Sequence, residues 1–553
     1  MRPRCGLLQW RWVRRLPALA AALLLGCGGA TTQAPAPSSI TVGTALAADQ
    51  SVTRTLNAMP RTLDPSLLTD EPGQTVMDDL FEGLTTIGPD DNIVPGVARS
   101  WDMSADGKTW LFHLRPEARW SNGDPVTAAD FVYAWRREVD PKTGSEYAQA
   151  LAPIVNAEAI ATGHAPVDSL GVTALDAHTL RVALVSPTPY LLAVLADNYL
   201  LPLHRATIER YGDSWTRPAH MVSNGPYVLS ELIVGDRITL TRNPLYWGAA
   251  NVRVTRVTYY PLDPDEQVSR FMAGDVEMTS YFPGPQFRWL KSQLGNQVVT
   301  GPYLGIQMLG FNMIDPPFAH NRNLRLALNM AVDRNILADK IYQGLNRPAY
   351  SIVPPLPGYT PQTPAWASWS DDQRHAEARR LYAAAGYSAA HPLHVQLDYP
   401  TDDEHRDLMA ALAAMWRTNL GADVEPYNEE FRVLTQNLQL HKSSLFWNSW
   451  IGDFPDPFTF VQLAQKDDGQ NYGRFDDPRY EALLVAAGNE ADNAQRYRYF
   501  EQAEDLLNQE APFLPLVYYT TRHLIKPYLK GWHSNLQDRL PTRYLYVLEH
   551  QGR

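Results

Sequence analysis

Two kinds of hydrophobic spacing interleave along the chain and predict a mixed α/β protein. Apolar residues recur three and four positions apart through residues 401–421, which predicts a helix that ends at a glycine. Apolar and polar residues alternate between Ile238 and Tyr260, and dense apolar runs cover Leu445–Ile451 and Leu514–Tyr519, so these segments are predicted strands. No repeat of 20 to 50 residues is visible. The length of 553 residues then favours two or three domains.

Capping signatures mark several helix starts, because their side chains satisfy free N–H groups of the first turn. Three pairs have this spacing: Thr127 with Asp130, Ser370 with Gln373, and Thr401 with Glu404. Further helices are predicted from about Gly73 to a stop at Gly83, on both sides of Asp333, and from about Asn493 until Pro512 ends the pattern.

The N-terminus has the pattern of an export signal over residues 1–26. Five arginines precede an apolar run, Leu16 to Leu25, that is too short to span a bilayer. The run ends in Leu24-Leu25-Gly26-Cys27, which resembles the lipobox of bacterial lipoproteins. That resemblance implies acylation of Cys27 and attachment to a membrane through this lipid alone. The following residues are rich in Ala, Thr, Pro and Ser, so 27–50 is predicted to be a disordered tether, with folding starting near Ser51.

Cysteine content and charge exclude several functions. The only cysteines are Cys5, inside the signal, and Cys27, so the mature chain has no disulfide, thiolate metal cluster or cysteine nucleophile in its folded part. Cleavage removes five arginines and no acids, which takes the formal charge from -12 to -17. An acidic body argues against nucleic acid or an anionic membrane surface as a partner.

Motifs for catalysis or cofactor binding are missing from the sequence. There is no His-Glu-x-x-His helix, no Gly-x-Ser-x-Gly elbow and no phosphate-binding glycine loop. Acidic turns at 263–266 and 467–469 lack the ligand spacing of a calcium loop and are interpreted as solvated turns. We therefore predict a protein that is not an enzyme and that has no metal or cofactor.

One carboxylate stands out as a candidate binding group. Asp453 follows the predicted strand Leu445–Ile451 and Gly452, a residue that lets another backbone approach closely. If Trp447, Trp450 and Phe454 shield it from water, this carboxylate would bind an ammonium group strongly. In the alternative interpretation, Asp453 opens an Asp-Phe-Pro-Asp-Pro turn and binds only its own backbone.

Short motifs that follow one another along most of the chain resemble a known family. They are Leu63-Asp64-Pro65, Leu80-Phe81-Glu82-Gly83-Leu84, Pro95 to Trp101, Trp120 to Ala128, Ser223-Asn224-Gly225-Pro226-Tyr227, Asn243 to Trp247, Ala331-Val332-Asp333-Arg334 and Lys526-Pro527. In this order they resemble the extracytoplasmic oligopeptide-binding proteins of ABC-type peptide importers, solute-binding protein family 5. The likeness extends from about residue 55 to the C-terminus.

The resemblance implies a two-lobed, periplasmic-binding-protein-like α/β fold of type II, with an extra domain inserted in the N-terminal lobe. Lobe I would comprise 51–81, 207–304 and 521–553, the extra domain II 82–206, and lobe III 305–520. In this family a peptide lies extended between the lobes and its main chain pairs with strands of the protein.

Matching the family's segments to this chain implies a set of ligand-binding residues. Asp453 would bind the ligand's amino group, with Trp450, Ile451 and Gly452 in the same segment. The pocket-lining aromatics would be Tyr147, Tyr303, Phe431 and Tyr519. His405, in the first turn of its helix, would face a carboxylate. Two basic positions that hold a peptide's C-terminal carboxylate in the family are Tyr342 and Trp447 here, so longer, shorter or modified peptides also become plausible ligands.

The main functional hypothesis is a monomeric, lipid-anchored solute-binding protein of the cell envelope or periplasm that captures short peptides and delivers them to an ABC permease. Tyr342 and Trp447 motivate an alternative, a binder of murein-derived or otherwise modified peptides. An envelope peptide hydrolase, and a sensor or chaperone-like interaction protein on the same scaffold, are further hypotheses.

Overall fold

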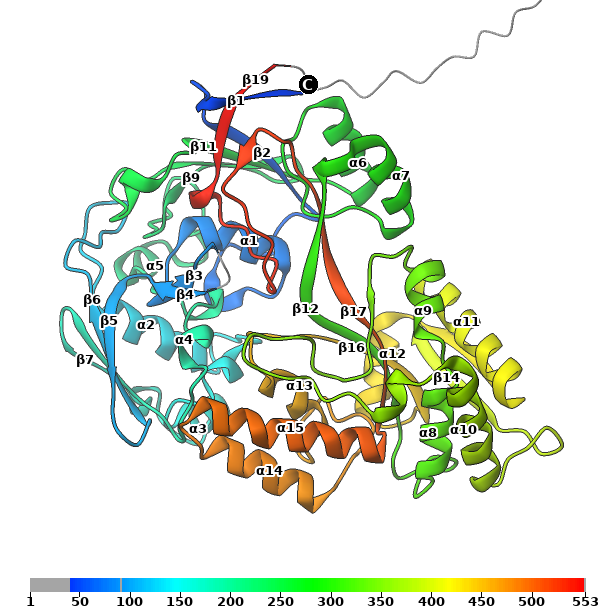
Figure 1. Ribbon diagram of the computed structural model, residues 1–553. Helices are drawn as coiled ribbons and strands as arrows, with labels where there is room; N and C mark the ends of the chain where they lie inside the picture. Colours follow the sequence, from blue (N-terminus) through cyan, green and yellow to red (C-terminus); the bar gives the residue numbers. More distant parts are fainter. Residues whose placement is uncertain (1–39, 90–91, 552–553) are drawn as a thin grey trace, which may run out of the picture. The chain divides into compact units, whose positions relative to one another are not determined.

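The computed structural model describes residues 40–89 and 92–551, in which helices and strands alternate (Figure 1). These residues belong to one compact unit of the chain. The predicted signal segment and the lipid-attachment residue Cys27 lie outside the described residues. Among the described helices, none combines the length and the apolar character that a membrane crossing requires.

The first strand begins earlier than the sequence predicts. β1 (Thr41–Leu46) pairs antiparallel with β19 (Tyr546–Gln551), and β18 (Leu529–Lys530) completes a three-stranded sheet. The side chain of Gln50 donates to the carbonyl of Val547 at 2.8 Å and accepts from its N–H at 3.0 Å. The prediction of a tether reaching residue 50 is therefore wrong for β1. Because most of β1 is exposed, its sequence carries no hydrophobic alternation that would reveal a strand.

A four-stranded sheet lies next along the chain. Its order is β2 (Ser51–Leu56), β11 (Arg256–Pro261), β10 (Arg237–Arg242) and β9 (Tyr227–Ile233). The alternation predicted between Ile238 and Tyr260 is confirmed, since Ile238, Leu240 and Val257 are fully buried. Helix α1 (Glu71–Leu80) follows β2, and helices α6 (Pro264–Ala273) and α7 (Phe287–Leu294) follow β11.

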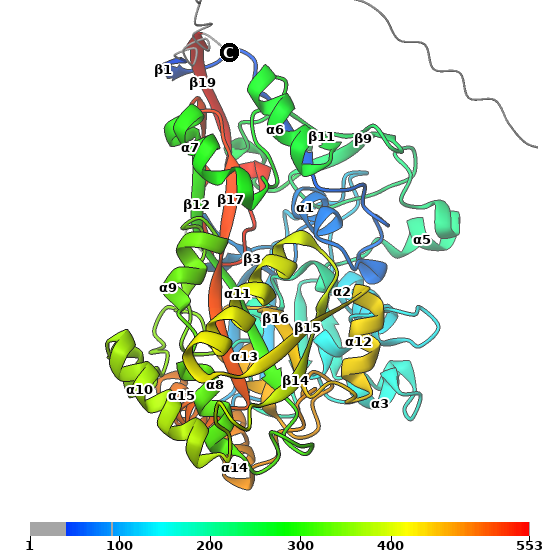
Figure 2. The same ribbon diagram turned by 90° about the vertical axis from the view of Figure 1, so that its right-hand side faces the viewer.

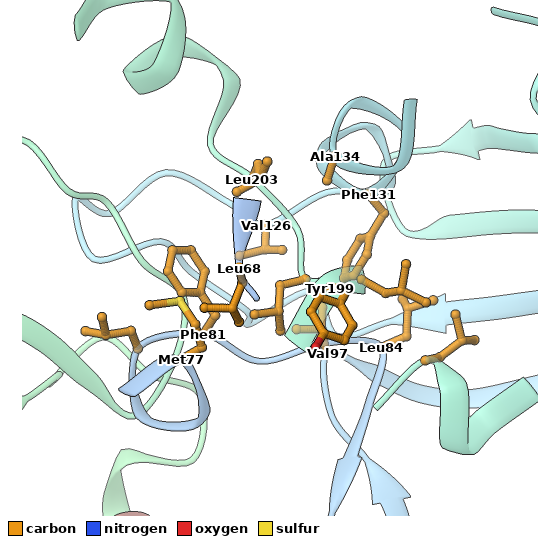
Figure 3. Packing of buried hydrophobic residues seen from close by; sticks show 14 of the residues in the cluster. Leu68, Met77, Phe81, Leu84, Val97, Val126, Phe131, Ala134, Tyr199 and Leu203 are labelled. Carbon is orange, nitrogen blue, oxygen red and sulfur yellow. The ribbon is translucent and has the colours of Figure 1, made fainter. Parts of the chain in front are cut away.

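Residues 82–206 form their own sheets but share a core with the first sheet. One sheet has the order β5 (Ala98–Met103), β6 (Thr109–Leu114), β8 (Thr179–Ala183) and β7 (Val172–Asp176), and β3 (Thr85–Ile87) pairs with β4 (Ile93–Pro95). Helix α2 (Ala128–Val139) starts with the predicted capping box. Figure 3 shows Met77 and Phe81, at the end of α1, in the same buried cluster as Val126 and Phe131. This shared core fixes α1 against residues 82–206.

The largest sheet has six strands. Its order is β13 (Arg347–Pro348), β17 (Phe513–Leu524), β12 (Val298–Phe311), β16 (Leu445–Ile451), β14 (His394–Pro400) and β15 (Asp423–Glu429). Helix α11 (Asp403–Leu420) lies beside β14 and β15, and α10 (Asp371–Ala384) packs against α11 and α8 (Arg322–Met330) (Figure 2). Alternation along β12 buries Leu309 in a core with these helices and Met308 in another with α14 (Pro478–Gly488) and α15 (Asn493–Glu510).

Two long strands connect this sheet with the rest of the protein. β12 and β17 run side by side and pair antiparallel from Val298 to Gly310 (Figure 1). The lobe boundaries expected at 304/305 and 520/521 fall inside these strands. Their pairing is irregular between Pro302 and Ile306, where the register shifts. A second shift lies between Gln307 and Met308. Such irregularities disrupt the ladder and allow a strand pair to bend locally.

Helix boundaries mostly follow the predicted signals. Ser370 and Gln373 form the predicted capping box of α10, and α15 ends at Glu510, before Pro512. The predicted box at Thr401 is wrong, because the carboxylate of Asp402 caps α11 and accepts from the N–H of His405 at 2.9 Å. A carboxylate is stabilised at a helix N-terminus by the free N–H groups and by the helix dipole.

Candidate functional site

A cavity of about 470 Å³ opens where β16 and β17 face α1 and the loop 537–540. Three of the residues predicted for the site line it: Tyr303, Ile451 and Tyr519. A second cavity, of about 490 Å³, shares Tyr303 and Tyr519 with the first. Burial raises the pKa of both tyrosines above the ordinary value, so their hydroxyls remain hydrogen-bond donors at neutral pH.

The segment that carries Asp453 leaves β16 at a close backbone contact. The N–H of Gly452 donates to the carbonyl of Leu304 at 2.7 Å, and a Cβ on Gly452 would lie 2.8 Å from a Leu304 methyl carbon. This is the close approach that the glycine predicts. Asp453 then donates its N–H to the Thr459 hydroxyl at 3.2 Å, and its carbonyl accepts from the Gln537 amide at 3.3 Å.

Asp453 carries an uncompensated carboxylate. Asp453 is an exposed residue, so the expected shielding from water by Trp447, Trp450 and Phe454 is wrong. Among the described residues no Lys, Arg or His forms an ion pair with its carboxylate. The surrounding protein nevertheless desolvates the carboxylate and raises its pKa to about 6, repulsion from Asp197 adds to this, and a hydrogen bond with Thr459 opposes it. Asp453 does not line the 470 Å³ cavity itself, but its neighbours Ile451 and Gln537 do. At neutral pH this negative charge can pair with an ammonium group at the cavity's edge.

The turn after Asp453 is held by a different acid. The Asp456 carboxylate accepts from the N–H of Phe458 at 2.9 Å and makes two 2.7 Å bonds with the Arg496 guanidinium. Both side chains of this ion pair are almost fully buried. In the alternative sequence interpretation Asp453 makes the turn's own side-chain bond, but here that bond belongs to Asp456. The Asp453 carboxylate keeps its hydrogen bond with Thr459 and has no cationic partner among the described residues.

The two tryptophans of β16 lie on opposite faces of the sheet. Trp447 shares a face with Ser449 and Ile451, which line the cavity, because side chains alternate along a strand. Its indole N–H is buried and has no acceptor among the described residues. Trp450 points to the other face, packs in a hydrophobic cluster and donates to the Thr459 hydroxyl at 3.1 Å. Trp450 thus helps to position Thr459 and does not line the cavity.

His405 and Tyr342 are engaged by protein groups. The His405 ring contacts the Trp447 ring edge-on, with centroids 4.7 Å apart, and its Nδ1 atom pairs with Asp402. Tyr342 is buried and donates its hydroxyl to the Gln307 side chain. Neither residue lines the 470 Å³ cavity.

The structure separates two predicted aromatics from the cavity. Phe431 starts α12 (Phe431–Gln439) and leaves 60% of its surface exposed. Tyr147 stacks on Tyr199, with ring centroids 3.9 Å apart, and Tyr199 in turn accepts a hydrogen bond from the cavity residue Gln74. Tyr147 is therefore one residue removed from the cavity wall.

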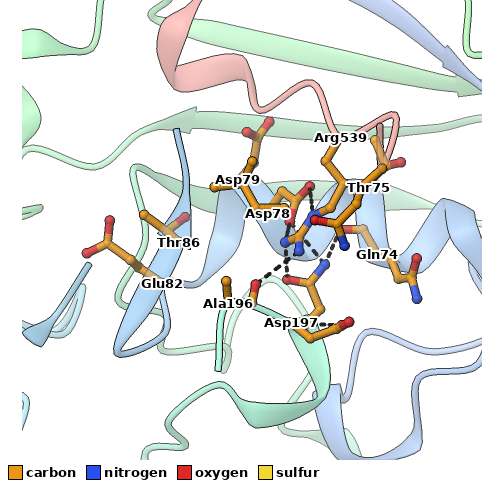
Figure 4. Close-up of polar contacts among 12 residues, drawn as sticks. Gln74, Thr75, Asp78, Asp79, Glu82, Thr86, Ala196, Asp197 and Arg539 are labelled. Atoms are coloured by element: carbon orange, nitrogen blue, oxygen red, sulfur yellow. Dashed lines mark hydrogen bonds and ion pairs between the residues drawn. The ribbon is translucent and has the colours of Figure 1, made fainter. Parts of the chain in front are cut away.

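Several cavity residues were not predicted from the sequence. Arg539, from the loop 537–540, forms an ion pair with Asp78 of α1 and donates to the Ala196 carbonyl at 3.0 Å (Figure 4). His523 pairs with Asp538 at 2.7 Å. Tyr281 and Arg522 also line the cavity. Tyr281 lies more than 200 positions before Arg522, His523 and Arg539 in the sequence, so no local motif joins them.

No cluster of three His, Cys, Asp or Glu side chains that could hold a metal occurs within residues 40–89 and 92–551. The cavity wall includes tyrosine hydroxyls and charged side chains on α1 and β17, which can form hydrogen bonds and ion pairs with a ligand.

A cavity between two sets of sheets joined by long strands defines a solute-binding architecture. Residues 92–472 match the family described as bacterial extracellular solute-binding proteins, family 5 (middle region). The chain belongs to this family. It is 37% identical over 513 residues to the periplasmic murein peptide-binding protein MppA of Escherichia coli, covering 92% of this chain and 95% of that protein. It is 35% identical over 543 residues to the periplasmic oligopeptide-binding protein OppA of Escherichia coli, covering 97% and 99%.

Among solved structures, the unliganded open form of the murein tripeptide-binding protein MppA matches with a TM-score of 0.83 and 37% identity. The match covers 92% of this chain and 99% of that one. The predicted fold class, a two-lobed α/β fold of type II, is confirmed by this likeness.

Proposed function

We propose that this protein captures short peptides in its cavity and delivers them to an ABC permease as a monomeric binding protein. The observation that carries the proposal is the Asp453 carboxylate, which lies at the edge of a polar cavity and has no cationic partner among the described residues. When it is ionised, it can bind the ammonium group of a ligand in a charge-assisted hydrogen bond. Relatives at 35 to 37% identity whose names state peptide binding support the same ligand class.

Binding would be coupled to closure about the strand pair β12 and β17. The cavity is lined on one side by residues of α1 and the loop 537–540 and on the other by β16. A ligand that touches both sides stabilises a closed state by its additional contacts there, and the permease would recognise that state. The likeness to an unliganded open form is consistent with a structure ready to receive a ligand.

Attachment to a membrane through Cys27 is part of the proposal. It is supported by Leu24-Leu25-Gly26-Cys27 at the end of the apolar run, and by the periplasmic location stated in the relatives' names. Expression of full-length chain with labelled palmitate tests it. Label in the wild type and none in Cys27→Ser, with the variant moving to the soluble fraction, is expected; a label that survives the substitution contradicts anchoring at Cys27.

Murein-derived peptides are a second candidate ligand class. The chain is 37% identical to a murein peptide-binding protein, and the uncharged residues Tyr342 and Trp447 occupy positions expected to be basic. A ligand with an altered or extended C-terminal end would suit such a site.

Two measurements test the proposed function. Native mass spectrometry of the purified protein identifies a copurifying ligand, and calorimetry with trialanine, tetraalanine and murein tripeptide ranks the classes. Micromolar or tighter binding of at least one is expected; absence of binding to all three would refute the peptide proposal. The bound peptide should stay intact over a long incubation, whereas its cleavage would instead support the hydrolase hypothesis.

A further inference from the structure

Arg522 is a cavity residue whose positive charge lacks a carboxylate partner. It belongs to β17, pairs in register with Thr300 of β12, and is partly buried in the cavity wall. Its guanidinium lies over the Tyr281 ring, 4.4 Å from the ring centroid. Within residues 40–89 and 92–551 it forms no ion pair with Asp or Glu. The guanidinium also hydrogen-bonds the Tyr281 hydroxyl. Because a guanidinium has five N–H donors, the others can still bind a planar anion.

The other cations of the cavity are already neutralised or bound. Arg539 pairs with Asp78, and His523 pairs with Asp538. Arg54 donates to the Leu540 carbonyl and to the Thr542 hydroxyl, both at 2.9 Å, and is buried. Among these cavity cations, Arg522 is therefore the one that is available to bind an anionic group of a ligand.

The groups around Arg522 form a corner at the C-terminal part of β17, between the six-stranded sheet and Tyr281. The charge of Arg522 lowers the pKa of three tyrosines, Tyr281, Tyr342 and Tyr519. The charge of Glu404, in the first turn of α11, raises the pKa of the same three. Thr520, also on β17, donates its hydroxyl to the Leu345 carbonyl at 2.7 Å. Glu404 and Arg522 act on the same tyrosines, and no ion pair joins the two in the described structure. The corner offers a positive charge bordered by tyrosines and one acid.

Strand register places Arg522 at a peptide's length from Asp453. Ile451 pairs with Gly305 and Gly452 bonds to Leu304. Continued past the end of β16, this register brings Asp453 level with Tyr303, three residues along β12 from Thr300, the partner of Arg522. Three residues along a strand measure about 10 Å, and the two strand spacings between β16 and β17 measure about 10 Å. In a regular sheet these offsets correspond to a backbone separation of about 14 Å, which is on the order of the length of an extended tri- or tetrapeptide.

We propose that Arg522 binds the carboxylate of the ligand, so that the ligand class is a short peptide with a free ammonium group at Asp453 and a free carboxylate at Arg522. The inference rests on the proposed function. The two positions that are expected to be basic in the family are occupied by Tyr342 and Trp447 in this chain. The proposal assigns recognition of the ligand's carboxylate to Arg522 on β17 instead. The carboxylate would accept the free N–H groups of the guanidinium in a charge-assisted pair.

Calorimetry with trialanine and its C-terminal amide, trialaninamide, tests this inference. The wild type should bind the acid at least about tenfold more tightly than the amide. In Arg522→Gln this ratio should fall to about one, because the acid loses affinity and the amide does not. Arg522→Lys should keep part of the preference. Glu404→Gln, which removes a competing negative charge, should increase it.

The matched control is Arg253→Gln, which removes an exposed guanidinium outside the cavity and should keep the wild-type ratio. Melting temperatures show whether each variant is folded. An Arg522→Gln protein that is folded, binds trialanine and still prefers the acid as strongly as the wild type overturns the inference while the peptide proposal survives. A wild type that binds neither compound refutes trialanine as a ligand and, with it, this inference. Binding of the larger peptides would still support the proposed function.

Discussion

The phenol ring of Tyr190 lies flat against the ring of Phe454, with centroids 4.7 Å apart and planes inclined by 2°. Tyr190 comes from residues 82–206, whereas Phe454 directly follows Asp453. The guanidinium of Arg496 covers the same tyrosine, 4.9 Å from its ring centroid. Burial raises the pKa of Tyr190 to about 12, which keeps it uncharged at neutral pH. This stack therefore fixes the segment that presents the candidate binding carboxylate.

Replacing Tyr190 by leucine should loosen that segment. Loss of the aromatic stack is expected to lower the free energy of unfolding by about 1 kcal/mol and to weaken trialanine binding severalfold. The measurements are urea denaturation and calorimetry. Tyr211→Leu is a suitable control, since Tyr211 stacks on His220 at 3.9 Å away from the cavity. It should cost similar stability without changing affinity. Equal losses of trialanine affinity in both variants would show that the loss in Tyr190→Leu does not come from the segment next to Asp453.

The buried pair of Asp456 and Arg496 should dominate the stability of the same turn. Asp456→Ala leaves a buried guanidinium uncompensated, so the free energy of unfolding should fall by about 3 to 5 kcal/mol. Glu209→Gln breaks the pair with Arg205, whose side chains are more than half exposed, and should cost less than about 1 kcal/mol. Urea titrations compare the two. Similar losses would mean that burial does not set the strength of these pairs.

Asp453→Ala should remove the main attraction for a ligand's ammonium group. The expected loss in trialanine affinity is about 2 to 5 kcal/mol, as for one partner removed from a close charge pair. Asp467→Asn, an exposed acid outside the cavity, should leave the affinity unchanged. N-acetyltrialanine should bind the wild type as weakly as trialanine binds the variant. Unaltered calorimetric affinity in Asp453→Ala would exclude the assigned role.

Peptide affinity should depend on pH through Asp453. Its pKa of about 6 in the free protein means that the carboxylate is mostly protonated at pH 5 and mostly ionised at pH 7. Since an ammonium group binds the ionised form, affinity should rise with pH, and trialanine should bind about tenfold more weakly at pH 5 than at pH 7.

The control for this pH effect is Asp453→Asn, which should bind weakly and lose the step near pH 6. Any dependence that remains would report on the His523 and Asp538 pair in the cavity wall. A step that is the same in Asp453→Asn and in the wild type would assign the titration to another group.

Sequence reasoning identified the strand Leu445–Ile451 because a dense apolar run needs a buried place, and Gly452 because only close packing explains a glycine there. It could not assign the faces of this strand, since Trp447 and Trp450 are both aromatic and only register decides which one shares a face with the cavity residues Ser449 and Ile451. It missed β1 because an exposed edge strand has no hydrophobic pattern. Arg522 and Tyr281 were invisible for another reason: tertiary topology alone brings them together.

Replacing the buried indole of Trp447 should change the stability of the protein little but should weaken peptide binding. Its N–H has no acceptor among the described residues, a state that costs about 1 to 3 kcal/mol relative to a satisfied donor. Trp447→Phe removes this donor but also some buried area, so the free energy of unfolding should change by less than about 1 kcal/mol. If the N–H serves a ligand acceptor, trialanine affinity should fall about fivefold.

Trp416→Phe provides the matched comparison. The Trp416 indole is also buried, but its N–H donates to the Leu328 carbonyl at 2.9 Å. Its replacement leaves that carbonyl without its donor and should cost about 2 kcal/mol of stability with no loss of affinity. Opposite behaviour of the two variants, measured by urea denaturation and calorimetry, would place a ligand acceptor at Trp447. A Trp447→Phe protein with wild-type affinity would show that its N–H has no role in peptide binding.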